Sequence, residues 1–306
     1  MLMQYIVSFL IKIDSLKNVP WNKLLIHIFY VTLLIAGIPL FYIFEICYVL
    51  PTVIEPFTIT YFIHILCSTF LFINIVSNMV YAVLTKTSIK GLLLQPTFKQ
   101  KDWSLCAVCE TIRPPRAWHC DVCNICVLKR DHHCTFLATC IGYFNYRYFF
   151  LFTFYIFLAM VYAFYYNVYF LAKVIDWNDK WIILKFIFPL LSVSVNRGPD
   201  TVYVLVFVFN VLFGLYSGFL FFFHLDNLLS GCTTPERKII GSNYNFALCF
   251  YRGTKDFIYN SGKGYKSNLV ESLGSRWYLT WISPFINSPL PGNGIYWPTK
   301  EDTKCK

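Results

Sequence analysis

Four long apolar runs constrain the fold of this chain more than any other feature. They cover residues 24–50, 57–84, 149–172 and 201–225. A helix needs about 20 apolar residues to cross the hydrocarbon core of a bilayer, so each run is long enough to span it. Glu45 is the one formal charge inside these runs. Helices buried in a large soluble core are the alternative, but uncharged runs of this length are rare outside membranes. We therefore expect four transmembrane helices.

The composition and the remaining segments agree with a membrane protein. Charged residues make up 14% of the 306 residues, against about 25% in an average soluble protein. The stretch 181–195 is apolar but short, and Lys185 and Pro189 interrupt it, so we expect it at the membrane interface. The segment 1–13 lacks the basic region and cleavage site of a signal peptide, and we expect it to lie on the membrane surface. The expected segments are an N-terminal segment 1–23, a helix pair 24–84, a loop 85–148, a second helix pair 149–225 and a tail 226–306.

The basic residues predict the orientation of the helices. Of the 26 Lys and Arg residues, nine lie in 85–147, ten in 226–306 and three in 1–23. Only four lie elsewhere, at Lys173, Lys180, Lys185 and Arg197. Because basic loops stay on the cytosolic side, we expect both termini and the 85–147 loop to face the cytosol. The net charge of +10 on that face favours anionic lipid headgroups or a phosphorylated substrate over nucleic acid as partners.

Cysteine is concentrated in the predicted cytosolic loop. The chain has twelve Cys, and seven of them fall between Cys106 and Cys140. A reducing compartment disfavours disulfides, so clustered Cys with interleaved His indicate metal ligands or nucleophiles. Cys47 and Cys67 lie within spans, where we expect apolar packing. The other three, expected to be free surface thiols or acylation sites, are Cys232, Cys249 and Cys305.

The loop follows the spacing C-x2-C-x9-H-C-x2-C-x2-C-x4-D-H-H-C-x5-C. The candidate ligands are Cys106, Cys109, His119, Cys120, Cys123, Cys126, His133 and Cys140. Eight ligands suit two tetrahedral zinc sites, each with three Cys and one His. Zinc would supply the folding free energy, about 10 kcal/mol per site, so we expect turns and short strands rather than long helices. A nucleic-acid finger is the alternative, but the 12-residue, helix-bearing separation of DNA fingers is absent.

Asp131, His132 and Cys134 remain once both zinc sites are filled. A Cys with an adjacent His and a carboxylate is the arrangement of nucleophile, base and orienting acid. His132 would take the thiol proton, and Asp131 would fix the imidazole tautomer. The alternative is that Cys134 is a spare zinc ligand and His132 a solvated surface residue.

The run Asp131-His132-His133-Cys134, within this spacing and between the second and third spans, resembles the DHHC family of protein S-acyltransferases (palmitoyltransferases). Thr233-Thr234-Pro235-Glu236 resembles the TTxE motif of that family. Tyr259, Asn268 and Leu273-Gly274 resemble its C-terminal motif, and Gly142, Asn145 and Tyr146 also fit. The resemblance covers most of the chain. It implies an all-α integral membrane protein with four transmembrane helices and a cytosolic double-zinc domain between helices 2 and 3.

The resemblance also implies a ping-pong acyl transfer. Cys134 would attack a long-chain fatty acyl-CoA with His132 as base and Asp131 orienting it, and the acyl group would pass to a Cys of a substrate protein near the bilayer. Residence in an endomembrane, the ER or Golgi, follows from the same resemblance. Weak candidates for the CoA phosphates are Arg116, Lys129, Arg130 and Arg147, for each of which a solvated basic surface is the alternative.

The chain departs from the family pattern directly after Cys134. Members usually show Pro-Trp-x-Asn-Asn there, whereas this chain has Thr135-Phe136-Leu137-Ala138-Thr139. This keeps open a catalytically weak or inactive zinc-bearing membrane scaffold as the alternative function. A transporter is a weaker third hypothesis, because the spans carry little formal charge beyond Glu45.

Overall fold

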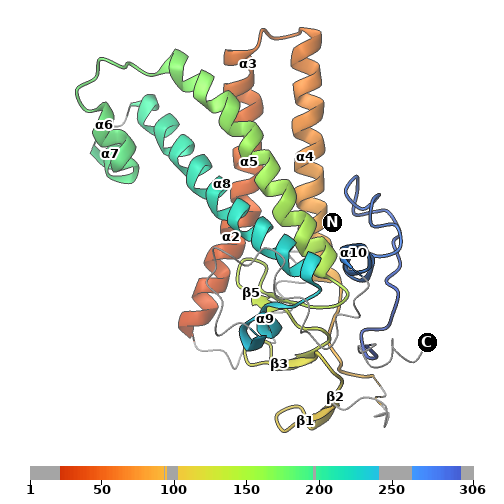
Figure 1. Cartoon of the computed structure of the whole chain (residues 1–306). Helices are drawn as coiled ribbons and strands as arrows, with labels where there is room; N and C mark the ends of the chain where they lie inside the picture. The colour runs from red at the N-terminus through yellow and green to blue at the C-terminus, as the bar shows by residue number, and fades with distance from the viewer. Residues whose placement is uncertain (1–20, 93, 95–102, 196–197, 241–263, 298–306) are drawn as a thin grey trace. The chain divides into compact units, whose positions relative to one another are not determined.

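The computed structural model describes residues 21–92, 94, 103–195, 198–240 and 264–297 (Figure 1). The expectations for segment 1–13, Tyr259, Cys249 and Cys305 concern residues outside these ranges. The described chain divides into two compact units. The first comprises the described residues within Met1–Leu34, Val76–Phe152 and Phe222–Lys306, and the second comprises those within Ile35–Ile75 and Thr153–Phe221.

Within the described ranges, four helical segments are long and apolar enough to cross a membrane: Leu24–Val53, Ile59–Leu84, Tyr146–Val174 and Pro199–Ser230. The first consists of α2 (Trp21–Phe44), the π-helix η1 (Glu45–Val49) and α3 (Leu50–Val53). The others are α4 (Ile59–Leu84), α5 (Tyr146–Val174) and α8 (Pro199–Ser230). The prediction of four spanning helices, with a Cys-rich region between the second and third, is confirmed.

The second unit consists of helical segments packed through aromatic and aliphatic side chains. Phe44, Phe170 and Tyr203 meet through their rings around buried Val49 and Val204. The stretch expected at the membrane interface forms two short helices, α6 (Ile182–Ile187) and α7 (Pro189–Val195). Helices of six and seven residues are too short to span a bilayer.

Polar contacts in the second unit also tie helices together. Asn167 donates to Glu45 at 2.7 Å, so the one formal charge inside the predicted apolar runs has a buried polar partner. Lys185, expected only as an interruption, is buried and pairs with Asp179 and Asp200. Cys47 and Cys67, expected to be apolar packing residues within the spans, are exposed on their helices, so the protein core does not bury them.

The Cys-rich region of the first unit folds into three antiparallel hairpins. They pair β1 (Ser104–Cys106) with β2 (Thr111–Arg113), β3 (Trp118–Cys120) with β4 (Ile125–Val127), and β5 (His132–Cys134) with β6 (Thr139–Ile141). Each strand has three residues, far too little to bury a core of its own. The prediction of turns and short strands instead of long helices is confirmed.

A buried asparagine joins the hairpins to two helices of the first unit. Asn145 is fully buried and donates to Ala82 O at the end of α4 (2.8 Å) and to Cys140 O in β6 (2.9 Å). It accepts from the backbone N–H of Gly142 at 2.8 Å. A Cβ at Gly142 would lie 2.5 Å from Leu128 O, so only glycine allows this approach. These contacts place the third hairpin against the start of α5.

The C-terminal part of the first unit adds α9 (Thr234–Ile240) and α10 (Tyr265–Leu273). Gly231, which directly follows α8, has a φ of +69°, and a Cβ there would lie 2.8 Å from Asn268 Oδ1. Asn268 donates to Leu229 O at 2.8 Å. Asn268, which carries part of the family resemblance, therefore attaches α10 to the end of α8.

Candidate active site and zinc-binding clusters

The eight predicted ligands gather into two clusters. The first cluster is Cys106, Cys109, His119 and Cys126, and the second cluster is Cys120, Cys123, His133 and Cys140. In each, the candidate ligand atoms lie within 4.8 Å of one another. Each cluster therefore holds one C-x-x-C pair together with one His and one further Cys.

The strand registers explain this division. His119 lies opposite Cys126 in the β3–β4 hairpin, so both side chains leave the same face, and the adjacent Cys120 leaves the other. In the same way His133 lies opposite Cys140 in the β5–β6 hairpin. The β3–β4 hairpin thus contributes to both clusters, one from each face.

The spacing of the ligand atoms fits zinc. Three sulfur atoms lie 3.3–3.7 Å from His119 Nδ1 in the first cluster and 3.2–3.7 Å from His133 Nδ1 in the second. With Zn–S of about 2.3 Å and Zn–N of about 2.0 Å, a tetrahedron has sulfur–nitrogen edges of roughly 3.5 Å. Three thiolates and one imidazole at these separations suit a structural zinc ion in each cluster.

The same alternation along β5 separates His132 and Cys134 from the metal ligand between them. Successive side chains on a strand point to opposite faces, so His132 and Cys134 share the face that His133 does not use. Cys134 is 7% exposed and is not a member of either cluster.

Asp131 lies at the centre of a hydrogen-bond network. It is buried, and its Oδ2 lies 2.7 Å from His132 Nδ1. Thr234, in the TTxE-like motif, donates its backbone N–H to Asp131 Oδ1 at 2.9 Å and its hydroxyl to Oδ2 at 3.0 Å. The carboxylate thus fixes His132 with the proton on Nδ1, which leaves Nε2 as the basic atom.

Electrostatics keep this pair ionised. Burial favours the neutral acid, but hydrogen bonding from His132 and the nearby imidazoles hold the pKa of Asp131 well below its usual range. Burial alone would lower the pKa of His132, whereas hydrogen bonding to Asp131 and Cys134 raises it to about 10. An imidazolium at His132 is a suitable counter-charge for a thiolate.

Two further residues of the site were not foreseen from the sequence. His224, in α8, has its Nδ1 3.8 Å from Asp131 Oδ2 and its ring 5.4 Å from that of His132. Phe149, in α5, meets the His132 ring edge-on at 4.8 Å. Each comes from an apolar run outside the Cys-rich loop, and a single His or Phe in such a run has no local signal that marks it for a site.

The four CoA candidates have different surroundings. Arg116 donates to both oxygens of Glu236 at 2.7 and 2.8 Å and to Gly231 O at 2.7 Å, with its side chain 1% exposed. Lys129 is buried and pairs with Glu271 at 2.6 Å. The cationic groups of these two residues thus have acidic partners inside the protein.

The other two candidates, Arg130 and Arg147, are partly buried. Arg130 donates its backbone N–H to Arg116 O at 3.1 Å. Arg147 donates to Ser288 O at 2.5 Å and lies over the Tyr148 ring at 4.4 Å. None of these contacts involves a carboxylate.

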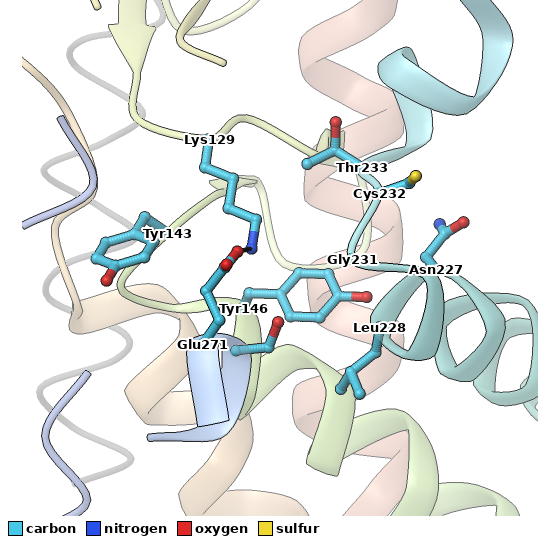
Figure 2. A pocket seen from close by; sticks show the side chains of 10 residues that line it. Lys129, Tyr143, Tyr146, Asn227, Leu228, Gly231, Cys232, Thr233 and Glu271 are labelled. Carbon is cyan, nitrogen blue, oxygen red and sulfur yellow. Dashed lines mark hydrogen bonds and ion pairs between the residues drawn. The ribbon is translucent and has the colours of Figure 1, made fainter. Parts of the chain in front are cut away.

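The ion pairs of Arg116 and Lys129 join three segments, because Glu236 lies in α9 and Glu271 in α10. Figure 2 shows Lys129 reaching Glu271 at the edge of a small pocket, with Cys232 and Thr233 on its far side. Cys232, expected as a surface thiol or acylation site, is buried there, so that expectation is wrong. Burial raises the pKa of its thiol to about 11.

Comparisons with known proteins agree with this site. The family model for DHHC palmitoyltransferase matches residues 99–240. A protein named probable palmitoyltransferase ZDHHC24 from Danio rerio is 33% identical over 240 residues, which is 76% of this chain and 74% of that protein. Its namesake from Rattus norvegicus is 29% identical over 75% of this chain and 76% of that protein. Palmitoyltransferase ZDHHC15 from Xenopus laevis is 37% identical over 64% of this chain and 50% of that protein. With these matches added to the two clusters and the Asp131-His132-Cys134 arrangement, the chain belongs to the DHHC palmitoyltransferase family.

Proposed function

We propose that this chain is a protein S-acyltransferase that takes a long-chain acyl group from acyl-CoA onto Cys134 and passes it to cysteines of substrate proteins. Membership of the DHHC family supports protein S-palmitoyltransferase activity. The geometry that carries the proposal is the exclusion of Cys134 from both clusters, on the strand face it shares with His132.

The first step of the proposed reaction forms the acyl-enzyme. His132 Nε2 holds the proton of the Cys134 thiol, so that an imidazolium faces a thiolate, and the thiolate attacks the carbonyl carbon of the thioester. The bond from that carbon to the CoA sulfur breaks, and the CoA thiolate takes the proton from His132. Asp131, held by Thr234, stabilises the charged imidazole throughout.

The second step transfers the acyl group to a protein thiol. A substrate cysteine loses its proton to His132 and attacks the thioester at Cys134, which leaves as a thiolate and is protonated again. One thioester replaces another in both steps, so no nucleotide energy source is required. The substrate cysteine must approach near the membrane surface, since the acyl-enzyme lies in a chain with four membrane-spanning helices.

We assign the zinc ions a structural role. The two clusters would hold them, and zinc there would supply folding free energy to hairpins that are too short to be stable alone. His133, a candidate ligand in the second cluster, lies on the strand that carries Cys134, so zinc bound there would fix the backbone next to the nucleophile.

The proposal places the acyl chain among apolar side chains and the CoA phosphates at the basic face. An acyl chain gains roughly 0.8 kcal/mol for each buried CH₂. Arg130 and Arg147 are the candidates for the phosphates, because Arg116 and Lys129 already bind Glu236 and Glu271. The distribution of basic residues supports a cytosolic site with both termini on the same side. Residence in the ER or Golgi remains a proposal from the family.

Transfer to an acceptor peptide tests the function. Purified protein is incubated with labelled palmitoyl-CoA and a membrane-anchored peptide that contains one cysteine. We expect hydroxylamine-sensitive label on the peptide, and none with the Cys134→Ser variant. A protein that keeps its zinc but labels no acceptor would instead indicate the zinc-bearing scaffold.

A further inference from the structure

The turn that follows Cys134 has little support of its own. It spans residues 135–138 between β5 and β6. Ala138 has a φ of 46°, in the left-handed region that residues with a Cβ rarely adopt. The turn closes through a long hydrogen bond from Ala138 N–H to Thr135 O at 3.3 Å. A turn with this strain persists only where surrounding groups hold it.

A histidine from α2 binds the same carbonyl oxygen. His27 Nδ1 lies 3.2 Å from Thr135 O. Because a carbonyl only accepts, His27 is the donor, with its proton on Nδ1. His27 is 4% exposed, and its ring meets that of His133 edge-on at 5.0 Å. The residue after the nucleophile is therefore anchored by a buried side chain that lies more than one hundred residues earlier in the sequence.

A second α2 residue packs on the next position of the turn. The ring of Tyr30 lies 4.4 Å from that of Phe136. Residues three apart share one face of a helix, so His27 and Tyr30 approach the turn together. Ile26, directly before His27, and Phe29, directly before Tyr30, are 48% and 62% exposed, so they lie on the other side of α2.

We propose that His27 and Tyr30 are positioning residues that hold the turn 135–138 and thereby aim Cys134 at the acyl donor. They act through Thr135 and Phe136 and touch no reacting atom. This inference rests on the proposed acyl transfer, since the aim of Cys134 matters only if its thiol reacts. Small displacements of a reacting group lower rates strongly, so we expect a defect in acylation without loss of zinc.

A pair of conservative variants separates the hydrogen bond from packing. The amide nitrogen of Asn occupies the place of His Nδ1, whereas that of Gln occupies the place of Nε2. We therefore expect His27→Asn to keep the contact with Thr135 O and His27→Gln to lose it. Ile26→Ala, on the exposed face beside His27, is the matched control.

Two readouts on full-length protein decide the outcome. One is the single-turnover rate of Cys134 acylation by palmitoyl-CoA, and the other is the rate of Cys134 alkylation by N-ethylmaleimide, measured by peptide mass spectrometry. We expect about tenfold slower acylation and several-fold faster alkylation for His27→Ala and His27→Gln, with zinc content unchanged. His27→Asn and Ile26→Ala should stay within about twofold of the parent.

Equal rates for His27→Asn and His27→Gln would overturn the proposal, and this comparison stands even if His27→Ala fails to fold. A parent protein that is alkylated at Cys134 but never acylated would contradict the proposed function. In that case the alkylation rates still test whether the His27–Thr135 hydrogen bond holds the turn. Failure of the proposed function and failure of the positioning proposal are therefore distinguishable. Tyr30→Leu against Phe29→Leu repeats the comparison for the ring contact, with a defect expected only for Tyr30→Leu.

Discussion

Side chains alternate between the two faces of β5, and this alternation separates the residues of the Asp-His-His-Cys run. His133 and Cys140 lie opposite each other and join the second cluster, while His132 and Cys134 share the other face. His132 and His133 therefore have different surroundings although they are adjacent and of the same residue type. The sequence spacing predicted this division by counting ligands, and the strand register gives its physical cause.

Substitution of the two histidines should separate zinc binding from chemistry. His133→Ala removes a ligand, so we expect loss of about one zinc ion per chain and a less stable protein. His132→Ala should keep both zinc ions and lower acyl transfer by about 10²- to 10⁴-fold, because it removes the proton acceptor. Metal analysis and transfer assays of the two purified variants check this, and similar zinc loss in both would contradict the assignment.

His224 and His27 mark the limit of sequence reasoning at this scale. Each lies in an apolar run, where a single histidine fits ordinary packing as well as a site. Their roles depend on contacts with Asp131 and Thr135, which are 93 and 108 residues away in sequence. The spacing of Cys and His predicts the zinc ligands because those residues are close together in sequence. It contains no information about contacts between residues this far apart.

At the scale of elements, buried ion pairs attach α9 and α10 to the Cys-rich hairpins. Glu236 also accepts from the N–H of Thr233 at 2.7 Å, so one carboxylate binds both Arg116 and the start of α9. Arg116 further lies 4.5 Å from the centre of the Trp297 ring. The TTxE-like motif was recognised from the sequence, but the identity of its basic partner required the fold.

Removing Arg116 should destabilise this junction. Arg116→Met leaves the buried Glu236 without its charge partner, so we expect a loss of about 3–5 kcal/mol in stability. The double variant Arg116→Met/Glu236→Leu should recover part of that loss, because both charges are then gone. Thermal unfolding in detergent measures the change, with the exposed Arg276→Met as control. Equal melting temperatures for Arg116→Met and Arg276→Met would refute the role of the ion pair.

At the scale of the whole molecule, hydropathy predicted more than any other signal. The apolar runs predicted the number and order of the spanning helices, because the thickness of the bilayer sets the length of apolar sequence that a spanning helix needs. The structure shows that helices extend beyond these runs; α8, for example, continues through Asp226 to Ser230. Polar residues such as Asn227 are buried there by protein contacts, which hydropathy does not register.

Side-specific labelling tests the predicted orientation. Lys180 is exposed after α5, and Asn293 is exposed in the C-terminal part of the first unit. In sealed vesicles with the cytosolic face outward, Asn293→Cys should react with a membrane-impermeant maleimide at once, because the tail is expected on that face. Lys180→Cys should gain label only after detergent is added. The opposite pattern would place the tail and the Cys-rich region outside the cytosol.

The most direct test of the account measures zinc and acyl group on the same molecules. Protein purified with its zinc is loaded with palmitoyl-CoA, and native mass spectrometry and peptide mapping follow. We expect two zinc ions per chain, with one acyl group on Cys134 in molecules that keep both ions. Acylation that occurs only after a zinc ion is lost would show that Cys134 is itself a metal ligand and would contradict the account.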